Sequence, residues 1–217
     1  MHFVDHGPEP QRLKAYRDKY TTKWVDHYER RSGAKPSDSY WREFQTDLGG
    51  VFSGLCGYCE ADCKGEVDHF RPKSRFPRRV YEWSNWVYAC HDCNNSKSES
   101  WPKHGYVDPC ARTRASRPEG FFDFDLKTGA MILRAGLTPA RRKKAQGMIE
   151  DLKLNAVHHL KRRLIWICIV GKVLAGEDQS DPGHADFVQR FSARDCPLSS
   201  ITRALLVEQG YLEDNTT

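Results

Sequence analysis

Two Cys-x2-Cys pairs constrain the fold of this chain more than any other feature. Cys56 and Cys59 lie in the segment CGYC, Cys90 and Cys93 lie in CHDC, and thirty residues separate the pairs. Four thiolates on two tight turns complete the closed tetrahedral shell that is typical of structural zinc. Chance pairs or a redox dithiol are the alternative interpretation. We predict one structural Zn2+ ion that fastens residues 54–100, a segment too irregular to build a large core unaided.

The remaining cysteines carry less information. Cys168 lies within the apolar run LIWICIV and is predicted to be a small core residue. Cys63 could compete for the metal, although its spacing from Cys59 fits less well. Glu60 and His91 are predicted to lie on the surface of the two cysteine turns.

An Asp-His dipeptide, Asp68-His69, lies between the cysteine pairs in the segment VDHFRPKS. The Asp68 carboxylate can ligate a hard divalent cation. A histidine titrates near neutrality and can take a proton from water, so His69 is a candidate general base. Taken alone, the dipeptide would be a surface pair. Between two ends fastened by zinc, it is predicted to belong to a catalytic site.

Three further residues complete the candidate site. Asn85 can hold the His69 imidazole in one orientation, and Asn94 can bring a second oxygen ligand to the cation. Lys97 lies about one helical turn after Asn94 and is predicted to contact phosphate. The alternatives are a turn residue for Asn85 and a helix cap for Asn94.

Basic residues follow the Asp-His dipeptide at once. The segment RPKSRFPRR holds five basic residues in nine, while the whole chain has a net charge of +5. Arginine matches phosphate oxygens well, so Arg71, Lys73 and Arg75 are predicted to bind a nucleic-acid backbone. The alternative is a solvated loop. No base-reading motif accompanies this segment, so no target sequence is predicted.

Helical periodicity and turn signals divide the chain into three predicted regions: 1–53, mainly helical; 54–100, the metal-stabilised core; and 101–217, a hairpin followed by helices. Predicted helices cover 10–31, 38–52 with a cap at Ser37 or Asp38, a segment starting at Thr138-Pro139, a segment capped by Asn155 and ending near 175, 184–192, and 198–209. Residues 101–120 are predicted to form a loop. Lys127-Thr128-Gly129 predicts a β-hairpin turn. The fold class is therefore α+β, mainly helical around a zinc-stabilised centre.

Hydrophobic residues make up 39% of the 217 positions, which is enough for a core. No apolar run approaches the length of a membrane helix, and the first ten residues lack an apolar signal core. We therefore expect a cytoplasmic protein that binds no membrane.

The segments CGYCE, EVDHFRPKS, WSNW and ACHDCNNSKS together resemble the HNH endonucleases of the four-cysteine, ββα-metal type. The resemblance implies that His69 is the general base, Asp68 a ligand of the catalytic metal and Asn85 the residue that orients His69. It implies DNA as the substrate and the four cysteines as zinc ligands. Asn94 occupies a family position that is often His, and an amide oxygen favours Mg2+ or Mn2+ over zinc at the catalytic centre. Trp86 stands where many relatives have Leu, which affects packing.

A narrower resemblance extends over more of the chain. The segments YEWSNW, NNSKS, YVDP, FFDFDLKTGAMI and IEDLKLNAVHHLKRR are similar to PtuB-type nucleases of Septu and some retron anti-phage systems. This resemblance implies an SMC-like ATPase of the PtuA type as a partner. Such a nuclease could stay silent until the partner or a phage trigger releases it. The alternative function is a non-catalytic, zinc-stabilised module that binds nucleic acid.

Overall fold

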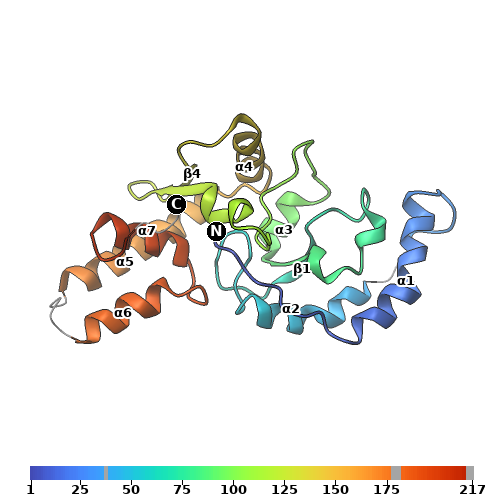
Figure 1. Cartoon of the computed structure of the whole chain (residues 1–217), viewed down its shortest axis with the longest axis horizontal. Helices are drawn as coiled ribbons and strands as arrows, with labels where there is room; N and C mark the ends of the chain where they lie inside the picture. Colours follow the sequence, from blue (N-terminus) through green and yellow to red (C-terminus); the bar gives the residue numbers. More distant parts are fainter. Residues whose placement is uncertain (37–38, 177–181, 214–217) are drawn as a thin grey trace.

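The computed structural model describes residues 1–36, 39–176 and 182–213. Figure 1 shows an elongated molecule with helix α1 (Leu13–Tyr28) at one end and the C-terminal helices at the other. The β-hairpin and helix that contain the Asp-His dipeptide and the second cysteine pair lie between these ends. Helices and two small sheets occupy separate parts of the chain, which confirms the α+β class.

The N-terminal region is helical as predicted. It contains α1, the 3-10 helix η1 (Tyr40–Phe44) and α2 (Gln45–Val51). The predicted cap at Ser37 or Asp38 lies outside the described residues. Aromatic side chains join α1 to η1: the Tyr20 and Tyr40 rings stack with centroids 4.3 Å apart, and the Trp24 and Trp41 centroids are 5.4 Å apart. These contacts place Trp41 beside the central hairpin.

The central hairpin pairs β1 (Glu66–His69) with β2 (Trp86–Ala89) in antiparallel register, with Asp68 opposite Val87 and His69 opposite Trp86. Between the strands lie the 3-10 helices η2 (Pro77–Arg79) and η3 (Trp83–Asn85). Helix α3 (His91–Lys97) follows β2 directly and begins between the cysteines of the second pair. The order strand, strand, helix thus brings the Asp-His dipeptide and α3 together.

A second hairpin forms where the Lys127-Thr128-Gly129 turn predicts one. It joins β3 (Phe122–Asp125) to β4 (Ala130–Leu133), after two short 3-10 helices, η4 (Arg114–Ser116) and η5 (Pro118–Gly120). The predicted cap at Asn155 is wrong. The Asn155 side chain accepts from Met131 N and donates to Met131 O, both at 2.8 Å, so it satisfies backbone groups of β4 rather than capping a helix.

Four helices complete the chain: α4 (Pro139–Asp151), α5 (Val157–Gly176), α6 (Pro182–Ser192) and α7 (Ser199–Glu208). Thr138 caps α4 by accepting from Arg141 N, as predicted. Helix α7 packs against both α5 and α6.

The prediction that Cys168 lies in the core is wrong, because the thiol is exposed. The run LIWICIV spans almost two helical turns, so its side chains point to all sides of α5. Helices α6 and α7 cover only part of that helix.

The main hydrophobic core contains residues from all three predicted regions, from Met1 and Leu13 through Trp86 to Leu154. A separate apolar cluster joins α5, α6 and α7. The predicted boundaries at 53/54 and 100/101 therefore separate residues that pack together in one continuous core. None of the described helices combines the length and apolar character needed to span a membrane.

Candidate active site and zinc-binding cysteines

The four predicted zinc ligands converge. The sulfur atoms of Cys56, Cys59, Cys90 and Cys93 all lie within 4.8 Å of one another. The Sγ atoms of Cys59 and Cys90 are 3.8 Å apart. A tetrahedral ion with Zn–S bonds of about 2.3 Å separates its sulfur ligands by about 3.8 Å. The donor set and its spacing therefore fit one structural zinc ion.

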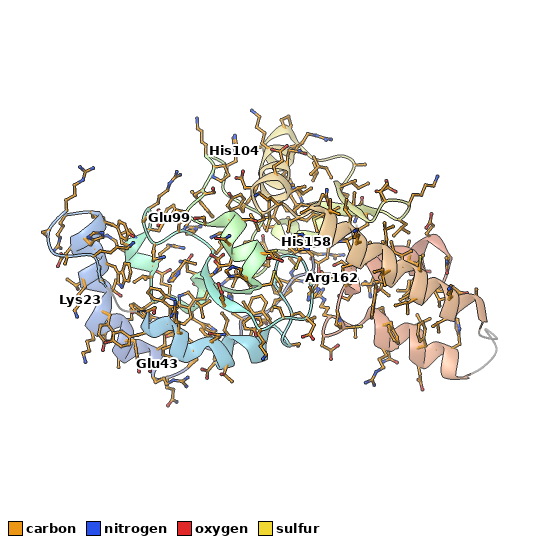
Figure 2. All side chains as sticks on the ribbon, turned by 180° about the vertical axis from the view of Figure 1, so that it is seen from behind. Lys23, Glu43, Glu99, His104, His158 and Arg162 are labelled. Atoms are coloured by element: carbon orange, nitrogen blue, oxygen red, sulfur yellow. The ribbon has the colours of Figure 1, made fainter. Side chains whose placement is uncertain are left out.

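Side chains outside residues 54–100 pack around this cluster. His159 of α5 is buried, and its Nε2 atom lies 4.0 Å from Cys93 Sγ. Beside it on the same helix, the Nε2 atom of His158 lies 3.5 Å from Oδ2 of Asp92 in α3. Figure 2 labels His158 together with Arg162 on this helix. Helix α5 thus contacts both the cysteine cluster and α3.

Glu60 joins the first cysteine turn to helix α7, contrary to its predicted place on the surface. It is only 3% exposed. Its carboxylate accepts from Ser200 N at 3.0 Å and contacts His2 Nδ1 at 2.9 Å. Its backbone oxygen accepts from Leu198 N at 3.0 Å. These partners lie far from Glu60 in the sequence, so local periodicity does not reveal its burial.

A polar cleft of about 730 Å³ opens beside β1 and α3. Asp68, His69 and Asn94, three of the predicted site residues, line it together. Glu99, which is labelled in Figure 2, also belongs to its lining. The cleft therefore brings the predicted general base and both predicted cation ligands to one cavity.

Asp68 is held by two buried donors. The Tyr58 hydroxyl donates to Oδ2 at 2.5 Å, and Lys97 Nζ donates to Oδ1 at 2.9 Å. Tyr58 and Lys97 are both fully buried, and Asp68 is 4% exposed. Lys97 Nζ also donates to the backbone oxygen of His69 at 2.8 Å. Its ammonium thus lies under the cleft, bound to protein oxygens, whereas the sequence predicts that it contacts phosphate.

The His69 imidazole is fixed by one hydrogen bond and by aromatic packing. Its Nε2 atom lies 2.9 Å from the Val80 carbonyl oxygen, which can only accept, so Nε2 carries the proton and Nδ1 the lone pair. The Trp41 ring packs against the imidazole at right angles, with centroids 4.8 Å apart. Burial lowers the pKa of His69 to about 3, and the Lys73 ammonium acts in the same direction. The ring is therefore neutral at neutral pH, and it does not titrate near neutrality as its residue type predicts.

Asn85 forms hydrogen bonds with the backbone of the loop that contains Val80. Its Oδ1 accepts from Arg71 N at 2.9 Å, and its Nδ2 donates to the Arg71 and Arg79 backbone oxygens at 3.1 Å. Arg79 directly precedes Val80. The contacts of Asn85 thus reach His69 through the backbone of this loop, whereas the sequence predicts that Asn85 orients the imidazole itself.

Asn94 is oriented by an acidic neighbour. Its Nδ2 atom donates to Glu66 Oε2 at 2.5 Å, and His91 Nδ1 contacts Glu66 Oε1 at 3.1 Å. Glu66 and Asp68 lie two positions apart on β1, so their side chains share one face of the strand, and both line the cleft. Because the amide nitrogen is bonded to Glu66, the Oδ1 atom of Asn94 is the oxygen that can serve a cation.

The predicted basic track is only partly at the cleft. Lys73 lines it, but Arg71 lies over the Phe76 and Trp101 rings, and Arg75 donates to Trp101 O. Sequence reasoning missed two exposed cations of the lining, Arg42 and Lys64. They come from η1 and from the segment before β1, and neither belongs to a basic run that would have identified it.

Comparison with known families agrees with this geometry. Residues 56–100 match the HNH endonuclease family model. These residues carry an HNH endonuclease domain. The domain begins at the first zinc-binding cysteine and includes both cysteine pairs, the Asp-His dipeptide, Asn85 and Asn94. Among curated proteins, no match to the chain was found.

Proposed function

We propose that this protein is a metal-dependent endonuclease that hydrolyses DNA phosphodiester bonds. The observation that carries the proposal is the convergence of Asp68, His69 and Asn94 in one polar cleft next to four clustered cysteines. A base and oxygen ligands for a cation are the groups that this hydrolysis requires.

The donor set of the cleft fits a hard divalent cation. Asp68 and Asn94 would hold Mg2+ or Mn2+ through oxygen atoms, which these ions prefer. When bound, such an ion stabilises negative charge on the phosphate and the leaving oxygen. Glu66 keeps the amide of Asn94 in the orientation that presents Oδ1.

His69 would activate the attacking water. Because Nε2 donates to Val80 O, the lone pair on Nδ1 is the proton acceptor. The perpendicular Trp41 ring restricts rotation of the imidazole and excludes water from one side of it. These contacts preorganise the base before substrate enters.

Cations at the cleft would bind the DNA backbone. Lys73, Arg42 and Lys64 line the cavity and can contact phosphates without reading the base sequence. Arg71 and Arg75 are proposed as further backbone contacts on the loop after β1. Lys97 is better supported as a partner of Asp68 than as a phosphate contact.

A role in anti-phage defence is a finer proposal. It rests on the similarity of several segments to PtuB-type nucleases and would add an SMC-like ATPase as partner. The alternative, a non-catalytic module that binds nucleic acid, uses the same cysteines and cations. It gives no reason for a buried, oriented imidazole beside two cation ligands, so the catalytic proposal is the better supported one.

Plasmid cleavage tests the proposed function. We expect supercoiled DNA to be nicked or linearised when Mg2+ or Mn2+ is added, and to stay intact without added divalent cation. Zinc content is measured in both samples, so that loss of the structural metal is not mistaken for loss of the catalytic one. DNA binding without cleavage, with either cation and with the proposed ATPase partner present, would contradict the proposal and support the binding module.

A further inference from the structure

We propose that Tyr58 and Lys97 are positioning residues that hold the Asp68 carboxylate as a cation ligand, and that through them each cysteine pair fixes one oxygen of that carboxylate. The proposal rests on the proposed function and concerns the cation site of the same cleft.

The two donors come from the two halves of the cysteine cluster. Tyr58 lies between Cys56 and Cys59 in the first turn, and its hydroxyl reaches Asp68 Oδ2 at 2.5 Å. Lys97 ends the helix that begins between Cys90 and Cys93, and its Nζ atom reaches Oδ1 at 2.9 Å. Asp68 is therefore held between elements that the zinc ligands bring together.

Because both donors are buried, they favour a single orientation of the Asp68 carboxylate. Tyr58 and Lys97 are each 0% exposed. A buried hydroxyl or ammonium that loses its partner has no water to replace it. Any rotation of the Asp68 side chain would break one or both bonds, so this carboxylate is held more rigidly than one that is solvated.

The arrangement still leaves Asp68 able to bind a cation. Each carboxylate oxygen has two lone pairs, and the two donors occupy one on each oxygen. Asp68 belongs to the lining of the cleft, so its remaining lone pairs can be reached from there. The two donors thus act on a metal ligand in the way that outer contacts commonly orient ligands at metal sites.

Lys97 also contacts His69, the proposed general base. The same ammonium donates to the His69 backbone oxygen at 2.8 Å, so it fixes the peptide group that follows His69. The neighbouring Val80 carbonyl fixes the ring of His69. The cation ligand and the base are therefore set relative to each other by one buried side chain.

The test compares two Tyr→Phe variants that each remove one buried hydroxyl. Tyr58→Phe removes the donor to Asp68. Tyr106→Phe is the matched control, because Tyr106 is 1% exposed, its hydroxyl donates to Asp151 Oδ2 at 2.6 Å, and neither residue belongs to the lining of the cleft. Mn2+ affinity is measured by electron paramagnetic resonance, with zinc content and thermal unfolding measured on the same samples.

We expect Tyr58→Phe to keep one zinc ion per chain and to bind Mn2+ about 10–100-fold more weakly than wild type. Tyr106→Phe should bind Mn2+ as wild type does. Equal Mn2+ affinity in Tyr58→Phe and wild type would overturn the inference, and so would a wild-type protein that binds no Mn2+. Weaker binding in Tyr58→Phe together with a wild-type protein that cuts no nucleic acid would support the inference and contradict the proposed function.

Discussion

The Nε2 atom of His69 donates to the carbonyl oxygen of Val80 over 2.9 Å. The Trp86 indole donates to the same oxygen at 2.9 Å, so the acceptor is held by two side chains of one hairpin. Val80 itself is fully buried in the loop between β1 and β2. This arrangement sets the tautomer of the proposed base through backbone geometry, and a carbonyl oxygen keeps its acceptor role at every pH.

Removing Lys97 should destabilise the protein strongly. In Lys97→Met, the buried Asp68 carboxylate loses its only ion-pair partner among the described residues. We expect a loss of about 3–5 kcal/mol in the free energy of unfolding, as is usual when one member of a buried pair is removed. Chemical denaturation measures this loss. The double variant Asp68→Asn/Lys97→Met should lose less than the sum of the two single variants. Additive losses would show that the pair is not coupled.

Asn85→Ala should lower both stability and cleavage. The Asn85 amide is 1% exposed and satisfies backbone groups of Arg71 and Arg79. Leaving these groups unpaired costs about 1–3 kcal/mol. The loop that positions the Val80 carbonyl would loosen, so the cleavage rate should fall as well. Asn95→Ala, at an exposed position of α3, is the stability control and should change unfolding by less than about 0.5 kcal/mol. An unchanged cleavage rate in Asn85→Ala would rule out its action on His69 through the loop.

Removal of zinc should abolish the cleft. Residues 54–100 contain two short strands, two 3-10 helices and one short α-helix, and the cysteine cluster links the two ends of this segment. Cys59→Ser should lower zinc content and the thermal midpoint, and added Mg2+ should not restore cleavage. Cys168→Ser, which changes an exposed thiol outside the cluster, should leave both quantities unchanged. A zinc-free protein with wild-type unfolding would contradict a structural role for the metal.

Charge removal at the cleft should weaken DNA binding. Arg42→Ala/Lys64→Ala removes two cations of the lining. We expect lower affinity for DNA of any sequence, and a salt dependence of the binding constant reduced by about 0.9 per lost phosphate contact. Arg142→Ala/Lys143→Ala removes the same charge from exposed positions of α4 and is the matched control. Equal losses in the two double variants would show that net charge, rather than the cleft, determines binding.

Local spacing predicted the features that a few neighbouring residues determine. The Lys127-Thr128-Gly129 turn forms its hairpin, and Thr138 caps its helix. Each of these depends on contacts within about one turn of chain. The convergence of the two cysteine pairs was predictable as well, because zinc chemistry demands four ligands.

Features that depend on distant packing could not be read in the same way. Trp41 reaches His69 from a 3-10 helix 28 positions earlier, and Asn155 binds Met131 across 24 positions. Helical phase placed Lys97 near Asn94 but could not show whether its ammonium faced solvent or Asp68. The apolar run of α5 likewise indicates a helix without showing which side is covered, so Cys168 was misplaced. The catalytic roles of Asp68, His69, Asn85 and Asn94 stay predictions.

The role of His69 as general base is tested most directly by the single-turnover cleavage rate of His69→Ala beside wild type in saturating Mg2+ or Mn2+. His158→Ala, which removes an exposed histidine from α5, is the control, and zinc content and unfolding are measured for all three proteins. If His69 is the general base, His69→Ala keeps its zinc and its fold while cleaving at least about 100-fold more slowly. Metal-dependent cleavage at the wild-type rate in folded His69→Ala would contradict this role.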